Sequence, residues 1–324
     1  MGGSVAWAKD RSIAVRPRRV TVLQVTARYP PAMATPRAPA SKRDPDLGLH
    51  PPGPIDGIRV GVGGWTYAPW RETFYPDGLV QRRELEYASR RLSAIEINGT
   101  YYSAQKPDTY ARWRDETPDG FVFTAKAPMR IVQSKVLAKT AGQVDAFVDG
   151  IATLGDKLGA ILWQFERKLD RDDFAAFVEH LPASAGGRPV RHALEVRDAE
   201  CVDTSLVGLA CTKNAALVFT DSDEWPSFSD LTADFVYARL MRARGNIETG
   251  YTKEELQAWA ERARTWATGG EPADLPRLGG PSPQAKKRDV FVFFINADKE
   301  RNPAAATTLI ELLQPATTKK KARA

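Results

Sequence analysis

Hydrophobic and polar positions alternate in two different rhythms along most of this chain. Short runs rich in Val, Ile, Phe and Ala are separated by longer segments whose apolar residues recur every three or four positions. The first rhythm is typical of buried strands and the second of amphipathic helices. The pattern predicts strands at residues 58–63, 94–98, 121–126, 159–164, 190–197, 215–220, 235–240 and 290–295. It predicts helices at residues 81–92, 107–117, 143–154, 171–181, 203–214, 252–268 and 303–313.

Strands that alternate with helices favour a parallel sheet, because parallel neighbours need a crossover connection. Eight such units within residues 57–318 match the size of one closed (β/α)₈ barrel of the TIM type. An open doubly wound sheet is the alternative. It is less favoured, because the turn at residues 61–65 does not complete the GxGxxG pattern of a dinucleotide-binding fold. We therefore expect an α/β protein with a single barrel.

The two ends of the chain differ from the barrel segment. Residues 1–56 are rich in Pro, Arg and Ala without a sustained period, which predicts a disordered basic tail, and residues 319–324 form a second basic tail. These tails carry net charges of +5 and +4, which leaves −3 for the segment between them out of the total of +6. The Pro/Gly-rich residues 269–288 precede the eighth strand and are interpreted as an inert insertion at the opposite end of the barrel from the strand ends.

Several features favour a cytoplasmic protein. Cys201 and Cys211 make neither a disulfide framework nor a metal-ligand spacing. No apolar run approaches the length of a membrane span. The apolar run at residues 20–23 is too short for a signal peptide, and a true start at Met33 is an alternative explanation for the unusual residues 1–32.

Polar residues end seven of the eight predicted strands. In a (β/α)₈ barrel, reactive groups collect at the C-terminal ends of the strands. A core that needed only to be filled would use Val, Ile and Leu at these positions, so the set as a whole predicts a functional ring. Its members are Glu96, Asn98, Lys126, Gln164, Glu195, Arg197, Asp221, Arg239 and Asn296.

Aromatic residues populate the loops that follow the strands. Trp65 and Tyr67 follow the first strand, Tyr102 with its neighbour Tyr101 follows the second, and Trp225 follows the sixth. Aromatic rings in these loops could stack on a sugar or a base, or could equally close the barrel mouth as a small satellite core. Trp65, Tyr67 and Tyr102 are the aromatic residues that we select as candidate substrate contacts.

The residue types in the ring indicate acid–base chemistry. Glu96 and Glu195 are the candidate proton-transfer groups, and a buried Lys126 could act as a base or as a Schiff-base amine. Lys126, Arg197 and Arg239 could neutralise a small anionic ligand that bears a phosphate or a carboxylate, such as a sugar phosphate. The first hypothesis is therefore a hydrolase, lyase or isomerase acting on such a ligand.

Two alternatives to this enzyme remain open. A nucleic-acid-binding or repair-like barrel is less favoured, because the barrel segment is acidic overall. A non-catalytic ligand-binding protein is the other. No organic cofactor is expected. A zinc cluster lacks ligands, because His50 lies in the predicted tail, His180 on a predicted helix and His192 near the start of the fifth strand, at the other end of the barrel. Mg²⁺ held by Glu96, Glu195 and Asp221 is compatible with the residue types.

Several motifs resemble, in the same order, those of the DUF72 family, the YecE-like proteins. They are Gly63-Gly64-Trp65-Thr66-Tyr67 with Phe74-Tyr75-Pro76, Glu96-Ile97-Asn98 with Tyr101-Tyr102, Thr117-Pro118-Asp119-Gly120-Phe121, Leu154-Gly155-Asp156-Lys157-Leu158-Gly159, Glu195-Val196-Arg197 and Tyr237-Ala238-Arg239-Leu240. The resemblance covers roughly residues 57–313 and implies a TIM-type barrel, with no established reaction. It implies a shared pocket that contains Glu96, Asn98, Lys126, Gln164, Glu195 and Arg197.

The chain departs from the family pattern after three strands. The family's Gln-Leu-Pro-Pro is replaced by Gln164-Phe165-Glu166-Arg167, and its Arg-Leu-His-Gly by Arg239-Leu240-Met241-Arg242. The eighth strand ends in Phe294-Ile295-Asn296-Ala297 where an aromatic-Phe-Asn-Asn run is common. Family chemistry that depends on these positions therefore does not carry over, because a candidate histidine is missing and Arg242 is added.

Overall fold

A closed barrel of eight parallel strands forms the centre of the structure. A computed structural model describes residues 52–279, 286–295 and 297–315. The barrel strands are β1 (Ile58–Gly63), β2 (Ala94–Ile97), β3 (Val122–Lys126), β4 (Leu158–Phe165), β7 (His192–Val196), β8 (Ala216–Asp221), β9 (Phe235–Leu240) and β10 (Asp289–Phe294). Each strand pairs with the next barrel strand along the chain, and β1 closes the barrel against β10. The predicted single (β/α)₈ barrel is confirmed.

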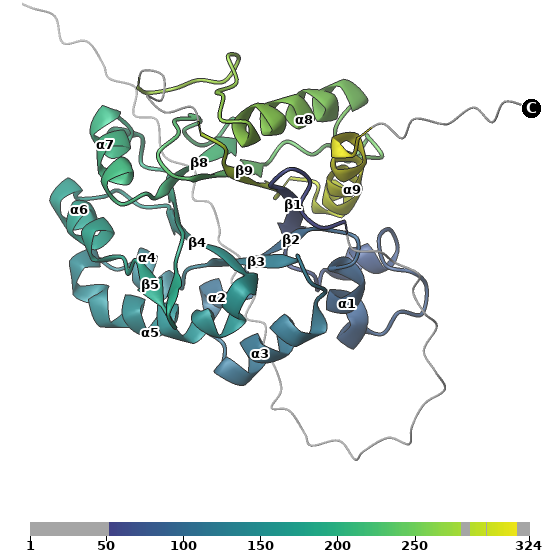
Figure 1. The fold of residues 1–324 in the computed structure, drawn as a ribbon, viewed down its shortest axis with the longest axis horizontal. Coiled ribbons are helices and arrows are strands. Elements are labelled where there is room, and N and C mark those ends of the chain that lie inside the picture. Colours follow the sequence, from purple (N-terminus) through teal and green to yellow (C-terminus); the bar gives the residue numbers. More distant parts are fainter. Residues whose placement is uncertain (1–51, 280–285, 296, 316–324) are drawn as a thin grey trace, which may run out of the picture. The chain divides into compact units, whose positions relative to one another are not determined.

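Helices surround the barrel, as Figure 1 shows. They are α1 (Glu84–Ala88), α2 (Gly99–Tyr102), α3 (Pro107–Glu116), α4 (Met129–Val132), α5 (Ala141–Ile151), α6 (Arg171–His180), α7 (Thr204–Thr212), α8 (Lys253–Ala267) and α9 (Asn302–Leu313). The connection from β8 to β9, residues 222–234, is described throughout and is a loop without a helix. None of the described helices is both long and apolar enough to cross a membrane.

Most predicted helices appear within a few residues of their expected ends, and the first is the exception. The expected helix at 81–92 is reduced to α1, because the chain has to turn at Arg90–Leu92 in order to enter β2. Ser93 fixes this turn, since its hydroxyl accepts a 2.8 Å hydrogen bond from the backbone N–H of Val60 in β1. A capping box begins the long helix α8, with the side chains of Thr252 and Glu255 bonding each other's backbone N–H.

The barrel interior is apolar toward the N-terminal ends of the strands and polar at their C-terminal ends. Interior side chains include Val122, Leu162, Val218 and Phe291, all of them buried. Gly159 on β4 makes room for this packing, because a Cβ at that position would lie 2.9 Å from the ring of Phe291. Side chains alternate between the two faces of a strand. The residue two positions after each of these inward-facing apolar residues therefore also points into the barrel, nearer to the C-terminal end of the strand.

The described part of the 269–288 insertion packs against the β8–β9 connection. The backbone N–H groups of Leu278 and Gly279 each donate a 2.8 Å hydrogen bond to the carboxylate of Asp230. A short hairpin that the sequence pattern did not predict, β5 (Ser184–Ala185) with β6 (Arg188–Pro189), precedes β7. Residues 1–51 of the predicted tail at 1–56, the predicted tail at 319–324, residues 280–285 of the insertion and the candidate Asn296 lie outside the described residues. Of the described residues 52–56, Ile55 forms an antiparallel bridge with Ile58.

Candidate functional site

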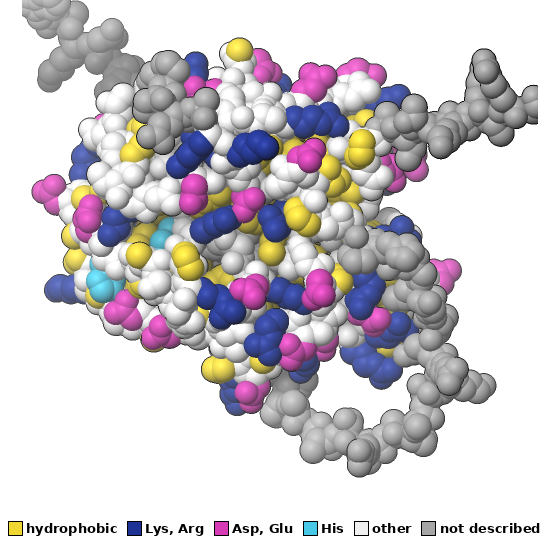
Figure 2. Space-filling view, in the orientation of Figure 1, with side chains coloured by type: hydrophobic (Ala, Val, Ile, Leu, Met, Phe, Trp, Pro, Cys, Tyr) yellow, Lys and Arg dark blue, Asp and Glu magenta, His cyan; other side chains and the backbone are white. Residues whose placement is uncertain are grey.

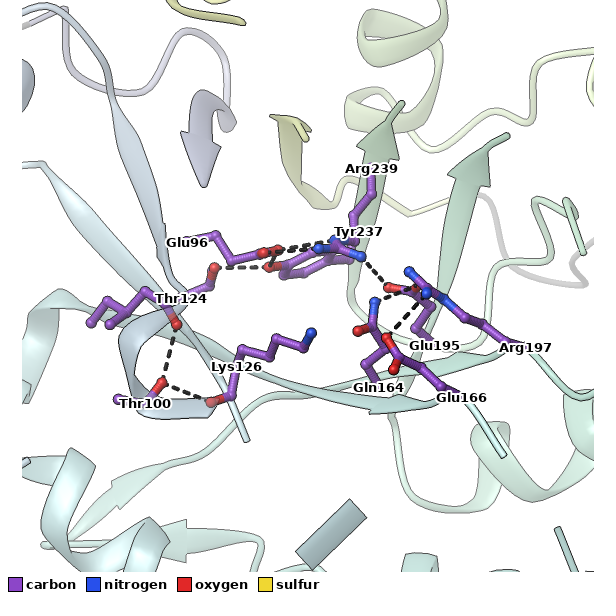
Figure 3. A network of polar contacts seen from close by, with 11 residues as sticks. Glu96, Thr100, Thr124, Lys126, Gln164, Glu166, Glu195, Arg197, Tyr237 and Arg239 are labelled. Atoms are coloured by element: carbon purple, nitrogen blue, oxygen red, sulfur yellow. Dashed lines mark hydrogen bonds and ion pairs between the residues drawn. The ribbon is translucent and has the colours of Figure 1, made fainter. Parts of the chain in front are cut away.

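Five candidate side chains meet inside the barrel at the C-terminal ends of its strands. Glu96, Lys126, Gln164, Glu195 and Arg239 come from β2, β3, β4, β7 and β9, respectively. Side chains two residues apart on a strand point to the same side, and each of these residues lies two positions after an inward-facing residue of its own strand. Lys126 also pairs in register with the inward-facing Leu162. Four of them are essentially buried, with at most 2% of the residue surface exposed, and Lys126 is partly buried. The predicted ring therefore exists as a spatial cluster (Figure 3).

Arg239 joins the two candidate carboxylates. Its Nη2 and Nε donate hydrogen bonds of 3.0 and 3.1 Å to the two oxygens of Glu96, and its Nη1 donates one of 2.6 Å to Glu195. Tyr237 precedes Arg239 by two residues on β9 and points to the same side of the strand. It donates a 2.8 Å hydrogen bond to Glu96 Oε2. The Tyr237 hydroxyl also lies 2.8 Å from Thr124 Oγ1. Glu96 therefore accepts three hydrogen bonds and is held in a single orientation.

The second carboxylate, Glu195, is engaged on both of its oxygens. Gln164 Nε2 and Arg197 Nε donate hydrogen bonds of 2.8 and 2.7 Å to Glu195 Oε1, while Arg239 occupies Oε2. Arg197 extends the network outward, because its Nη1 donates a 3.1 Å hydrogen bond to Glu166 and its guanidinium lies 4.3 Å from the ring centroid of Trp225. Each arginine of the cluster is thus shared between two carboxylates.

These contacts keep the central ion pairs charged. Burial alone would raise the pKa of Glu195, but Arg239 and Arg197 outweigh burial and the pKa is lowered from its ordinary value. Burial alone would lower the pKa of Arg239, but Glu195 and Glu96 raise it well above the ordinary value. Burial and the neighbouring Glu96 also raise the pKa of Tyr237. At neutral pH Glu195 is therefore ionised, and Arg239 and Tyr237 keep their protons.

Lys126 differs from the two arginines. Its Nζ lies 3.9 Å from the ring centroid of Tyr101, and within the described part of the chain it makes no hydrogen bond or ion pair. Its backbone is fixed, because the hydroxyl of Thr100 donates a 2.7 Å hydrogen bond to the Lys126 carbonyl. Burial and the nearby Arg239 lower the pKa of Lys126, against the opposing effect of Glu96, Glu166 and Glu195. The amine is therefore poised closer to its neutral form than an exposed lysine is.

One buried polar atom in the cluster also lacks a partner among the described residues. Gln164 uses its Nε2 on Glu195, whereas its Oε1 is buried and accepts no hydrogen bond there. In Figure 3 the Lys126 amine and the Gln164 side chain extend toward the same space between Glu96 and Glu166. A donor-rich ligand in that space would satisfy this oxygen, which otherwise costs stability as a buried unpaired acceptor.

The candidate Asp221 does not join the cluster. Thr220 is the inward residue at the end of β8 and pairs in register with Arg239, so Asp221 faces the outer side of the barrel wall. There its carboxylate forms a 2.9 Å ion pair with Arg242. Burial raises the pKa of Asp221, and Arg242 opposes this shift. The prediction that Asp221 shares the pocket is wrong, and the proposed Mg²⁺ triad with Glu96 and Glu195 is not assembled.

Metal-ligating residues do not cluster elsewhere in the described residues. Across residues 52–279, 286–295 and 297–315, no group of three or more His, Cys, Asp or Glu side chains is arranged to hold an ion. Glu96 and Glu195 also both use Arg239 as their counter-charge, so binding a divalent cation would require that pair to break.

The predicted aromatic contacts lie around the ring rather than in it. Trp65 packs edge-on against Trp113 of α3, with ring centroids 5.0 Å apart, and belongs to the outer hydrophobic core. Tyr67 packs against Trp70 and beneath the amine of Lys299. Tyr102 is 80% exposed.

The candidate Asn98 follows β2 at the barrel mouth. Its side-chain amide lies against Gly63 and occupies the space that a Cβ at position 63 would fill.

Several further residues contact the ring that the sequence did not select as site residues, among them Tyr101, whose ring lies against the Lys126 amine. Tyr237 and Thr124 lie two positions before Arg239 and Lys126 on the same strands, so they point into the barrel as well. This alternation could have identified them from the sequence. Glu166 was visible only as a departure from the family pattern, and Trp225 only as one loop aromatic among several. The contacts of the last two with Arg197 depend on how the loops after β4 and β8 fold over the barrel.

Comparison with known proteins defines the family. The model of the family described as "Protein of unknown function DUF72" matches residues 59–324, so the chain belongs to the DUF72 family. The UPF0759 protein YecE of Escherichia coli K12 is 27% identical over 139 residues, which are 42% of this chain and 48% of YecE. A second YecE, from Escherichia coli O157:H7, matches to the same extent. The matched segment thus spans about half the length of these curated relatives.

Solved structures agree with the fold. A DUF72 family protein from Thermotoga maritima aligns with a TM-score of 0.58 at 18% identity, covering 78% of this chain and 97% of that protein. A DUF72 family protein from Enterococcus faecalis aligns with a TM-score of 0.56 at 15% identity, covering 79% and 94%. At these identities the alignments establish the barrel and carry no information about a reaction.

Proposed function

We propose that this protein is an enzyme that acts on a small polar substrate at the barrel mouth, with Lys126 as its proton-transferring group. The observation that carries the proposal is the contrast between Lys126 and the arginines of the ring. Arg197 and Arg239 are each shared by two carboxylates, whereas the Lys126 amine has a lowered pKa and no ion pair within the described residues. A lysine whose pKa is lowered gives up its proton more readily than an exposed lysine does, which suits a general acid or base.

The two glutamates take a supporting role in this proposal. Glu96 and Glu195 are locked by Arg239 and by neighbouring donors, so neither has the spare coordination that a mobile proton carrier needs. Their negative charges instead favour the protonated form of Lys126 and so oppose the lowering of its pKa by burial. The expectation from the sequence that they are the proton-transfer groups is therefore revised, and they are better described as positioning residues.

The charge balance of the ring limits the substrate. Glu96, Glu166 and Glu195 balance Arg197, Arg239 and a protonated Lys126, so the site has little excess positive charge. A phosphate dianion would need to displace Glu166 or Glu195 from Arg197. A neutral substrate, or one with a single negative charge that pairs with Lys126, fits the balance better.

A nucleic-acid partner receives no support from the surface that is drawn. On the face shown in Figure 2, Lys and Arg side chains are interspersed with Asp and Glu and do not form one continuous basic patch. A phosphate backbone is normally held by a contiguous basic surface. We therefore keep the small-molecule hypothesis for this protein.

A ligand screen with a matched pair of lysine variants tests the proposal. Thermal and urea unfolding of the full chain would be followed with neutral sugars, sugar acids, keto acids, sugar phosphates, nucleotides and Mg²⁺. A ligand at about 100 times its Kd adds about 2.7 kcal/mol to the free energy of unfolding. We expect Lys126→Met to abolish the gain for the binding compound. Lys299→Met should retain it, because Lys299 is also partly buried against aromatic rings but lies outside the ring.

Turnover of the binding compound, followed by NMR, then separates an enzyme from a non-catalytic binder. Lys126→Met itself should be no less stable than the parent, because it removes a partly buried charge that has no ion pair. If no compound stabilises the parent, and Lys126→Met is more than about 2 kcal/mol less stable, the ring is a structural network and the proposal is refuted.

A further inference from the structure

The surroundings of the Lys126 amine are asymmetric. One side of Nζ is covered by the Tyr101 ring, whose centroid lies 3.9 Å away. The other side faces the space toward Gln164 and Glu166 (Figure 3). Within the described residues the amine makes no hydrogen bond on this side, and Gln164 Oε1 there is itself buried and accepts none. The nitrogen lone pair of a neutral Lys126 thus has one direction in which to meet a ligand.

We propose that Lys126 is a nucleophile that forms an imine with the carbonyl carbon of its substrate, so the substrate class is a small aldehyde or ketone. This inference rests on the proposed function and narrows it. One contact and two neighbouring groups support it: the Tyr101 ring against the amine, and, in the space that the amine faces in Figure 3, the buried Gln164 Oε1 without a partner and the Glu166 carboxylate. Desolvation beside an aromatic ring and near other cations is how proteins activate an amine nucleophile.

The covalent step is balanced by groups in the ring. Nζ of the neutral amine adds to the carbonyl carbon and one proton of this nitrogen moves to the carbonyl oxygen, which gives a carbinolamine that keeps one N–H. Loss of the nitrogen proton and departure of the hydroxyl as water then give the imine, so amine and carbonyl yield imine and one water. Neither oxidant nor reductant is consumed.

Glu166 is the residue placed to move the proton in this step. Only its Oε1 is bound by Arg197, and no described side chain donates to its Oε2. A carboxylate with one anchored and one available oxygen can take the proton from nitrogen and deliver it to the leaving hydroxyl. Gln164 Oε1 can accept a hydrogen bond from a hydroxyl of the substrate next to its carbonyl, which satisfies the buried oxygen.

Reductive trapping on the full-length protein tests the inference. The protein would be incubated at pH 7 with glycolaldehyde, dihydroxyacetone or pyruvate and sodium cyanoborohydride, and adducts at each lysine would be quantified by peptide mass spectrometry. A parallel reaction with trinitrobenzenesulfonate measures plain amine reactivity. Lys299 is the control for a partly buried lysine against aromatic rings, and Lys139 is the exposed control.

We expect at least one carbonyl compound to label Lys126 about ten times faster than either control lysine. Glu166→Gln should slow this trapping without slowing trinitrophenylation, because the carboxylate acts on the dehydration step and not on the amine. In Lys126→Arg the selective adduct should vanish while labelling of Lys299 and Lys139 is unchanged.

Two results overturn the inference, and they differ in what they say about the proposed function. Selective trinitrophenylation of Lys126 without selective trapping by any of the three carbonyl compounds refutes the imine but leaves Lys126 as a proton carrier. Labelling of Lys126 no faster than Lys299 in either reaction refutes both, because the ring then gives this amine no special reactivity.

Discussion

Replacing Arg239 by methionine tests the central claim about the ring, which is that one buried arginine compensates two buried carboxylates. The side chains of Arg239, Glu96 and Glu195 are exposed by 3%, 0% and 2%, and the two ion pairs measure 3.0 and 2.6 Å. Removing one partner of a buried ion pair costs about 3–5 kcal/mol, because a charge is left without compensation. Folded domains are stable by only about 5–15 kcal/mol, so Arg239→Met should lose a large fraction of the total.

The matched control is Arg242→Met, three residues farther along the chain. Arg242 is 48% exposed and pairs with Asp221 at 2.9 Å and Asp223 at 3.0 Å. Asp223 is 87% exposed and Asp221 15%, so the loss should lie nearer to the about 0–1 kcal/mol of surface ion pairs than to that of a fully buried pair. Arg239→Lys keeps the charge but loses the two-pronged contact with Glu96, and should fall between Arg239→Met and the parent.

The pH dependence gives the prediction a second, independent readout. In the parent, the lowered pKa of Glu195 means that its stabilising contribution is present above its unfolded pKa and is lost only as pH falls through the folded value. Without Arg239, burial should raise the pKa of Glu195 above its unfolded value, because the main opposing charge is gone. The deficit of Arg239→Met should therefore be largest at pH 8 and shrink toward pH 5, as a carboxylate takes up a proton.

Urea unfolding, followed by tryptophan fluorescence between pH 5 and 8, measures both effects. A double-mutant cycle with Glu96→Gln and Glu195→Gln isolates the coupling, because the cost of Arg239→Met should be much smaller once both carboxylates are neutral. The reasoning is refuted if Arg239→Met lies within about 1 kcal/mol of the parent at pH 7, or if its deficit does not change with pH.

Two further predictions concern buried hydrogen bonds. Tyr237→Phe removes the donor to Glu96 and the partner of Thr124, and should cost about 1–3 kcal/mol in urea unfolding. A loss below about 0.5 kcal/mol would contradict the network. Burial lowers the pKa of His192 from 6.5 to about 4, with Trp163 donating to its Nδ1 and its Nε2 bonded to the Pro182 carbonyl. A depressed folded pKa means that stability is retained above pH 6.5 and falls by about 3 kcal/mol as pH drops to 4. His192→Gln should flatten this part of the pH profile, and an unchanged profile would show that another group is responsible.

Strand parity explains why much of the candidate site could be predicted from the sequence. Glu96, Gln164 and Glu195 end apolar strands at positions whose parity is that of interior residues, and a barrel brings all such positions to one mouth. Asp221 shows the limit of the method. It follows the predicted sixth strand by one residue, and a shift of one residue reverses the face on which a side chain lies.

The partners of the charged residues could not be predicted from the sequence. Arg239 is 143 residues from Glu96 and 44 from Glu195 along the chain, and several other carboxylates were equally eligible. Which of them it meets depends on strand tilt and register around the closed barrel. The same applies to Tyr101 and Trp225, whose contacts with Lys126 and Arg197 are made by a short helix and a loop.

The sequence by itself determined the eight strands, the parallel barrel they close and most of the polar side chains at its mouth, because hydrophobic periodicity and strand alternation are local properties. Only the tertiary structure decided which charges neutralise one another. It pairs both central glutamates with Arg239 and shares Arg197 between Glu195 and Glu166, and so distinguishes Lys126 from the other cations of the ring. The physical reason is that an ion pair depends on distances in space between residues far apart in the chain, and a linear pattern does not contain those distances.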